Sequence, residues 1–175
     1  MNRTIFEIWS EAGYELCQPV VQPDWNRMVG DFNGEARLAT WSALRVRLIR
    51  LDDAGMPLQR SAAPWLAHNV LMLRPAAVDA IRDLIAQDIQ FLPLECSDEN
   101  FLAVNVLRVR DALDESKSAV NKLRSGVRLP IARHVFLAER LGPEVIFKLE
   151  GWRASAIYVD QRFVDCWASH GLSGL

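Results

Sequence analysis

Hydrophobic and polar positions alternate in several stretches of the chain. In 44–48 (LRVRL), Leu44, Val46 and Leu48 alternate with two arginines, so the apolar side chains of an extended chain fall on one face. This is the period of a half-buried strand. Apolar runs rich in β-branched and aromatic residues predict further strands at 3–9, 14–21, 91–95, 100–110, 127–137, 145–150 and 155–160.

Two of these strands are predicted to be antiparallel neighbours. The runs 91–95 (FLPLE) and 100–110 (NFLAVNVLRVR) are separated by a short segment rich in Ser, Asp and Asn, which suits a turn. In the second run, Leu102, Val104 and Val106 would share one face. In 14–21, by contrast, a proline at position 19 places the strand at a sheet edge or ends it.

Two segments have helical spacing. In 75–87, Pro75 suits the first helical position, and Val78, Ile81 and Ile85 repeat along one face. The second helix is predicted near the end of the chain from a cap, an apolar stripe and a terminating glycine: Asp160, Phe163, Val164, Trp167 and Gly171. Strands therefore outnumber helices, and we predict an α+β fold, a mostly antiparallel sheet with two main helices packed on it.

Residues 22–35 (QPDWNRMVGDFNGE) combine turn-forming and large apolar residues. Pro23, Gly30, Asn33 and Gly34 favour a long loop over a regular element. The loop carries Trp25, Met28 and Phe32, so it is predicted to cover another part of the protein.

Composition indicates one globular domain over residues 1–175. Half of the residues are hydrophobic, and the net charge of −2 gives no basic field that would favour nucleic acid or an anionic membrane. Three widely spaced cysteines form no disulfide framework and no CxxC pair. We see no signal-peptide pattern and no run long enough to span a membrane, so a cytoplasmic location is expected.

The segment 111–117 (DALDESK) gathers titratable residues directly after a predicted strand. Asp111, Asp114, Glu115 and Ser116 are a possible acid/base set, for which His134 is a further candidate member. A catalytic acid needs a water-poor cleft, whereas this segment is polar at nearly every position. Asp114 is also well placed to accept backbone hydrogen bonds from the residues that follow it. We therefore interpret the segment as a capped turn.

Other chemical signatures are weak. His68, His134 and His170 are far apart and match no metal-binding spacing, and the phosphate-binding glycine motifs are missing. The serine in the final GLSGL is not in a GxSxG elbow. No metal and no cofactor are predicted.

Five arginines lie near two predicted strands and are the only set that suits phosphate contacts: Arg45, Arg47, Arg50, Arg108 and Arg110. Aspartates stand beside them in sequence, so we interpret them as a solvated or ion-paired face.

Many short segments, in order along the chain, resemble one known family. They are FNGEARLATWSALRVRLI (32–49), AAVDAIRDLI (76–85) with FLPLE, NFLAVNVLRVRDALDESKS (100–118), RHVF, VIFKL, SAIYVDQRFVD and GLSGL. The family is the eleventh in the numbered series of immunity proteins of bacterial polymorphic toxin systems. The resemblance spans most of residues 32–175, while residues 1–31 match less well.

The resemblance implies a non-enzymatic protein that binds and neutralises a cognate toxin in the producing cell. It supplies no catalytic residues. Because the loop 22–35 lies at the edge of the matched region, we predict that toxin contacts involve Trp25, Arg27, Met28 and Phe32. The alternative interpretation is that the apolar loop residues fold back as a lid on a sheet. Two alternative functions remain. The first is an enzyme whose active site, near 111–117, matches no known motif, and the second is a nucleic-acid-binding module that uses the arginines.

Overall fold

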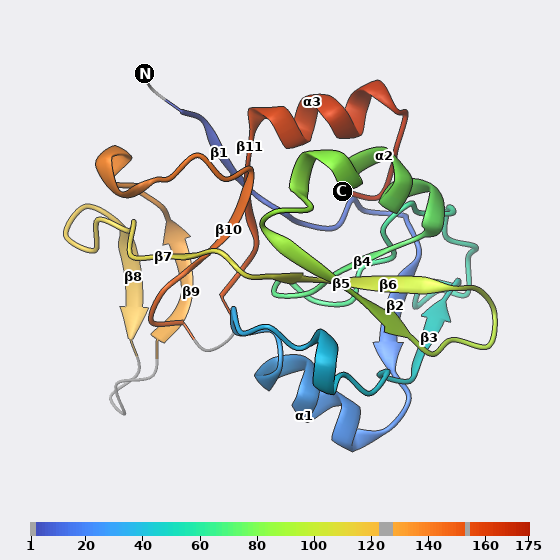
Figure 1. The fold of residues 1–175 in the computed structure, drawn as a ribbon. Helices are drawn as coiled ribbons and strands as arrows, with labels where there is room; N and C mark the ends of the chain where they lie inside the picture. The colour runs from blue at the N-terminus through green and yellow to red at the C-terminus, as the bar shows by residue number, and fades with distance from the viewer. Residues whose placement is uncertain (1–2, 123–127, 153–154) are drawn as a thin grey trace.

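Strands outnumber helices along the chain, as the hydrophobic pattern predicts (Figure 1). The computed structural model describes residues 3–122, 128–152 and 155–175, and these ranges contain three α-helices and eleven short strands. All but one of the pairings between these strands are antiparallel. The predicted α+β class is therefore confirmed.

The elements follow one another in this order. The strands are β1 (Ile5–Glu7), β2 (Leu16–Pro19), β3 (Val46–Ile49), β4 (Leu71–Leu73), β5 (Ile89–Leu94), β6 (Phe101–Val106), β7 (Val109–Arg110), β8 (Ala119–Lys122), β9 (Arg128–Arg133), β10 (Ile146–Leu149) and β11 (Tyr158–Asp160). The helices are α1 (Gln22–Gly30), α2 (Pro75–Ile85) and α3 (Gln161–Ser169), with two 3-10 turns at Leu38–Thr40 and Ala138–Arg140. The predicted strand 127–137 corresponds to β9, and its first residue lies outside the described ranges.

Four small sheets build the domain. The largest has the order β1-β11-β10-β7, in which only β7 runs parallel to its neighbour β10. A second sheet has the order β4-β6-β5, and β2-β3 and β8-β9 form two-stranded ribbons. Pro19 is the last residue of β2 and pairs with Val46, which agrees with its predicted place at the end of a strand.

The β4-β6-β5 sheet separates two hydrophobic cores. In β6, Val104 and Val106 are buried in one core, and Leu102 packs against the same core. Phe101 and Ala103 point into the other core. The alternation predicted for this strand is thus correct, and both of its faces are covered, which explains why the sequence of this strand is almost entirely apolar.

The two predicted helices pack together over the first core (Figure 1). Asp160 caps α3 by accepting a hydrogen bond from the Arg162 backbone N–H at 3.0 Å. The apolar stripe of α3 is buried at Phe163 and Trp167, whose rings stack with centroids 5.9 Å apart. Gly171 follows with φ +61°, a left-handed conformation that glycine adopts without strain.

The prediction of a loop at 22–35 is wrong for its first nine residues, which form α1. Proline is tolerated in the first turn of a helix, so Pro23 does not prevent it. The buried face of α1 consists of Asp24 and Met28, and Phe32 continues that row beyond the helix. Because the first buried position of α1 is an aspartate, the sequence does not show a continuous apolar row at helical spacing. In Figure 1, α1 lies on the side of the molecule opposite α2 and α3.

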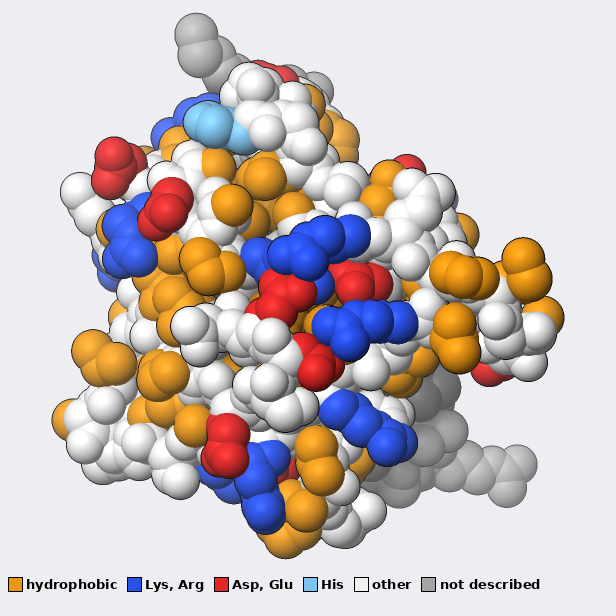
Figure 2. All heavy atoms as spheres, turned by 90° about the vertical axis from the view of Figure 1, so that its right-hand side faces the viewer, with side chains coloured by type: hydrophobic (Ala, Val, Ile, Leu, Met, Phe, Trp, Pro, Cys, Tyr) orange, Lys and Arg blue, Asp and Glu red, His pale blue; other side chains and the backbone are white. Residues whose placement is uncertain are grey.

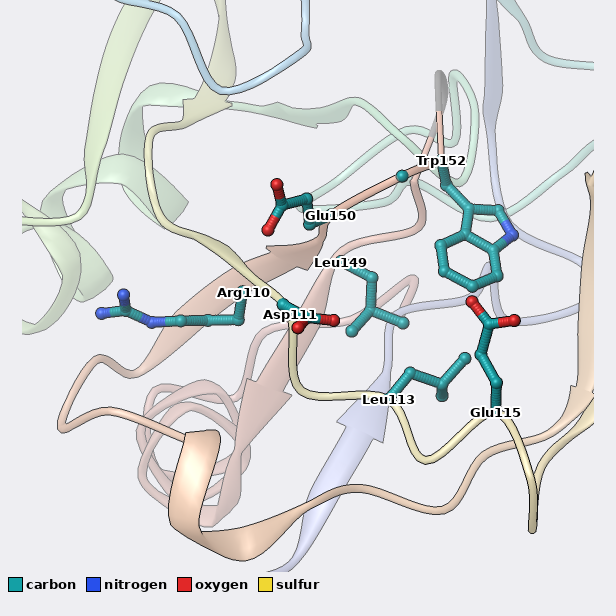
Figure 3. Close-up of a pocket in the computed structure, with 8 residues that line it drawn as sticks. Arg110, Asp111, Leu113, Glu115, Leu149, Glu150 and Trp152 are labelled. Carbon is teal, nitrogen blue, oxygen red and sulfur yellow. The ribbon is translucent and has the colours of Figure 1, made fainter.

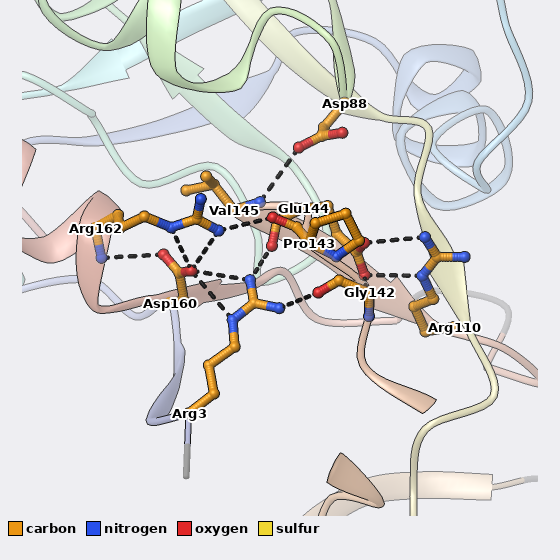
Figure 4. Close-up of polar contacts among 9 residues, drawn as sticks. All are labelled: Arg3, Asp88, Arg110, Gly142, Pro143, Glu144, Val145, Asp160 and Arg162. Atoms are coloured by element: carbon orange, nitrogen blue, oxygen red, sulfur yellow. Dashed lines mark hydrogen bonds and ion pairs between the residues drawn. The ribbon is translucent and has the colours of Figure 1, made fainter. Parts of the chain in front are cut away.

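Ionic contacts tie the ends of the largest sheet to the loops around it (Figure 4). Asp160 binds both Arg3 and Arg162, at 2.9 and 2.7 Å. Arg110 makes a two-pronged contact with Glu144 at 2.8 and 2.9 Å. These contacts hold the segment 142–145 beside β11 and β7, which anchors the strand β10 that follows.

Candidate functional site

The outer face of α1 carries an exposed apolar stripe. Trp25 and Val29 are four residues apart, so their side chains are neighbours on the helix surface. They are 39% and 38% exposed, and Val20, just before the helix, is 53% exposed. Trp25 is large and stiff, and such aromatic residues contribute much of the binding energy in protein interfaces. We call Trp25 and Val29 the α1 stripe.

The other face of α1 is part of the second core. Met28 is 4% exposed and Phe32 is fully buried, so neither side chain is available to a partner while the domain is folded. The predicted contact set is therefore corrected: Met28 and Phe32 pack beneath α1, as the lid interpretation implied. Trp25 remains at the surface.

Arg27 is engaged within the protein. Its guanidinium lies over the Trp41 ring, 5.0 Å from the centroid, and its Nε is 3.0 Å from an Asp31 carboxylate oxygen. It also donates to the Ser42 carbonyl at 2.7 Å. The side chain is 30% exposed. Arg27 thus braces α1 against the following loop and leaves only part of its surface for a partner.

Two buried side chains hold the C-terminal turn of α1. Asn69 Nδ2 donates to the Met28 carbonyl at 3.0 Å, and Lys148 Nζ donates to the Phe32 carbonyl at 2.5 Å and to the Asn69 carbonyl at 2.8 Å. The Met28 carbonyl belongs to the last turn of α1, where carbonyls have no partner within the helix, whereas the Phe32 and Asn69 carbonyls lie outside it. The contacts satisfy groups that burial would otherwise leave unpaired. They give the α1 stripe a rigid base.

Lys148 is an unusual residue for the middle of a strand. It is 1% exposed, and burial lowers its pKa from 10.5 to about 7. It lines a hollow of about 170 Å³, together with Phe32, Asn33 and Ser155. Sequence reasoning missed Lys148 because a single lysine in an apolar strand normally points to solvent.

A larger hollow of about 280 Å³ lies beside β7 and the end of β10 (Figure 3). Its floor includes Leu113 and Leu149, and the Trp152 indole stands at one side. The carboxylates that line it are those of Asp111, Glu115 and Glu150. The Arg110 side chain extends away from the hollow (Figure 3).

The predicted acid/base set does not assemble in this hollow. Asp111 and Glu115 line it, but Asp114 and Ser116 do not. Asp114 instead accepts hydrogen bonds from the Ser116 hydroxyl at 2.6 Å and from the Ser116 and Lys117 backbone N–H groups at 3.1 and 3.2 Å. The Ser116 hydrogen bond, followed by that of Lys117, lowers the Asp114 pKa from 3.8 to about 2. The segment is a capped turn, as we interpreted it.

His134 belongs to a different cluster. Its Nε2 lies 2.8 Å from the Tyr158 hydroxyl and 3.8 Å from a Glu7 carboxylate oxygen. In a catalytic relay, the carboxylate holds the ring nitrogen opposite to the one that faces the reacting group. Here both partners lie on the same nitrogen, and Tyr158 is 3% exposed. Phe136 stacks on the His134 ring, so the arrangement joins the segment after β9 to the largest sheet.

The predicted arginine face is divided between two sheets. Three of its members lie in or next to β3, and two lie in or next to β7. Four of the five arginines are in ion pairs with carboxylates: Arg45 with Asp24, Arg50 with Glu15 and Asp98, Arg108 with Asp88, and Arg110 with Glu144. Figure 2 shows basic and acidic side chains lying next to one another near the middle of one face of the molecule. This arrangement supports the ion-paired interpretation.

Within the described ranges, no group of three or more His, Cys, Asp or Glu side chains is placed to hold a metal ion. Cys17, Cys96 and Cys166 are free thiols. None of the helices in the described part of the chain combines the length and apolar character needed to cross a lipid bilayer.

The chain matches no protein-family model and no curated protein sequence. The features that bear on function are therefore those of the chain itself, the α1 stripe first among them.

Proposed function

We propose that this protein is a non-enzymatic immunity protein that binds and neutralises a cognate toxin domain in the cytoplasm of the cell that produces both. The observation that carries the proposal is the two-sided helix α1, whose inner face is locked into a core while Trp25 and Val29 are exposed on the outer face. The segment-by-segment resemblance over most of residues 32–175 motivates the same function, although the chain matches no family model.

The physical properties of α1 suit a preformed binding surface. Its stripe is held by the buried contacts of Met28, Asn69 and Lys148, so binding would order little additional backbone. A lower ordering cost leaves more of the contact energy for affinity. An inhibitory interface of ordinary size buries roughly 1,200 to 2,000 Å² in total, so the stripe would form its centre and neighbouring polar side chains its rim.

Co-expression tests the proposal. The toxin domain encoded beside this gene should arrest growth when expressed alone, and growth should recover when this protein is expressed with it. The purified pair should form a complex. Growth arrest that persists, or purified proteins that fail to associate, would overturn the proposal.

Matched tryptophan variants locate the surface. Trp25→Ala should weaken the complex by about tenfold or more, since truncating a central aromatic anchor commonly costs more than 1 kcal/mol. Trp9→Ala is the control, because Trp9 is 58% exposed but lies after β1 and stacks on Trp65, 6.0 Å away. Equal effects of the two variants on affinity would show that α1 is not the centre of the interface.

A further inference from the structure

Lys148 is a buried cation without a buried counter-charge. Among the residues that the structure describes, its amine is bound by two main-chain carbonyls, those of Phe32 and Asn69. A carbonyl is a good hydrogen-bond acceptor, but it does not offset the loss of hydration of a full positive charge. The buried site therefore favours the neutral amine over the ammonium form.

The position of these carbonyls connects Lys148 to α1. Phe32 lies two residues beyond the helix, and Asn69 binds the Met28 carbonyl within its last turn. Lys148 comes from β10, in the largest sheet, so it joins that sheet to the segment after α1. Movement of the segment 28–32 or of the turn at Asn69 away from Lys148 would open this position and let an ammonium group regain water.

We propose that Lys148 makes the docking of α1 depend on protonation, so that the neutral amine holds the segment 28–32 in place and proton uptake favours its release. With a pKa of about 7 in the closed state and 10.5 when hydrated, the pH effect on release builds up as the pH falls below about 10.5 and levels off below about pH 7. If release fully hydrates the amine, its pKa returns to about 10.5 in the open state. By linkage, the opening equilibrium should then fall by up to about thirtyfold between pH 6 and pH 8.5.

The other charged groups around this position are engaged elsewhere or lie farther along their elements. They are Arg110 on β7, bound to Glu144; Asp160 on β11, bound to Arg3 and Arg162; Asp31 after α1, bound to Arg27; and Glu35, bound to Arg37. Tyr158 on β11 has a pKa raised by burial, which keeps it neutral in this pH range. His68 precedes Asn69 in the sequence. Glu150 follows β10 and lines the same hollow as Lys148.

The consequence for binding rests on the proposed function. Lys148 anchors the segment that follows the helix carrying the α1 stripe, so release of that segment would loosen the binding surface. Affinity for the toxin domain should then be lower at pH 6 than at pH 8.5. The effect of protonation on α1 itself can be measured without any partner.

Amide hydrogen exchange of the isolated protein tests the proposal. Protection of residues 22–32, corrected for the intrinsic effect of pH on exchange, should rise several-fold or more between pH 6 and pH 8.5. Amides of α2 that exchange through local openings should change much less, because those openings leave Lys148 buried. In Lys148→Met the rise in the protection of residues 22–32 should disappear, because the methionine side chain has a similar length and does not titrate.

Two control variants separate Lys148 from other groups. Lys117→Met makes the same chemical change at a side chain that is 72% exposed, and it should leave the rise in α1 protection intact. His68→Gln should also leave it intact, although histidine generally titrates in this pH range. A flat α1 profile in the wild type, or a rise that survives in Lys148→Met, would overturn the proposal. Neither result depends on whether the toxin complex forms.

Discussion

The Asp24 carboxylate accepts a hydrogen bond from the Arg45 backbone N–H at 3.0 Å, which joins α1 to the beginning of β3. Asp24 is 7% exposed and lies on the inner face of the helix. The guanidinium groups of Arg27 and Arg45 approach the same carboxylate, each at 3.8 Å. One polar side chain thus replaces the apolar residue expected at this position of an amphipathic helix, and it ties the helix to a neighbouring strand.

Replacing Asp24 should destabilise the fold. Asp24→Ala leaves the Arg45 N–H without its partner in a poorly hydrated place, and such a loss typically costs about 1 to 3 kcal/mol. We expect chemical denaturation to show a decrease of about 2 kcal/mol in the free energy of unfolding. Asp79→Ala on the exposed face of α2 is the control and should change it by less than about 0.5 kcal/mol. Equal losses would argue against a special role for the Asp24 contact.

Trp25 and Trp41 should differ in what their truncation affects. Trp41 Nε1 donates to the Pro93 carbonyl at 2.8 Å, and its ring makes an edge contact with Phe32 at 5.7 Å. Trp41→Ala should therefore lower the free energy of unfolding by about 2 to 3 kcal/mol. Trp25→Ala should lower it by less than about 1 kcal/mol, because Trp25 is exposed on α1. Thermal unfolding of the two variants measures the difference, and a reversed order would contradict the assigned roles.

The local sequence pattern was sufficient to predict the structure where each residue faces the environment that its type prefers. Val104 and Val106 alternate with residues that face the second core, and Asp114 caps the turn that its neighbours suggest. The pattern failed where tertiary contacts reverse that preference. Asp24 is buried because a strand N–H needs an acceptor, and Lys148 is buried because two carbonyls converge on it. No local signal marks either residue.

The same limit applies to the candidate site. Trp25 was identified from its residue type, and it is exposed. Met28 and Phe32 were grouped with it because a loop gives no rule for which side chains point inward. Once α1 is known, the spacing of four residues separates the row that includes Met28 and Phe32 from the row that includes Trp25 and Val29.

The turn at Asp114 should titrate at unusually low pH. The Ser116 hydroxyl and the Lys117 contacts favour the carboxylate, so its pKa in the folded protein is about 2. The folded pKa is below the unfolded value, so the contribution of this group to stability is present above about pH 4 and is lost as the pH falls towards 2. An NMR titration of the side-chain carboxyl carbon should give a midpoint near 2 in the wild type. In Ser116→Ala the midpoint should move up towards the usual aspartate value.

An unshifted Asp114 midpoint in the wild type would contradict the capped turn. A midpoint above the usual value would instead favour the acid/base interpretation of this segment, since a general acid needs a raised pKa.

Arg74 should be the most sensitive member of the ionic cluster between β2 and the turn after β5. It is 6% exposed at its side chain and lies 2.9 Å from Glu15 and 2.8 Å from Glu99. Glu15 is itself buried, with 6% of its side chain exposed. Arg74→Met removes the closest positive charge from Glu15, because the remaining cation, Arg50, lies 3.4 Å away and is half exposed. We therefore expect a loss of about 3 to 5 kcal/mol in the free energy of unfolding at neutral pH.

Arg60 offers a matched comparison, because it binds the same Glu99 at 3.0 Å but is 68% exposed. Arg60→Met should cost no more than about 1 kcal/mol, since water screens an exposed ion pair. Adding Glu15→Gln and Glu99→Gln to Arg74→Met should recover part of the lost stability by removing the charges that Arg74 compensated. Equal losses for the two arginine variants would show that burial does not set the strength of these contacts. Failure of the triple variant to recover stability would show that Arg74 acts mainly through contacts other than these ion pairs. Those contacts are packing on Phe101, whose ring centroid is 5.1 Å from its guanidinium carbon, and the hydrogen bond to the Ser61 carbonyl.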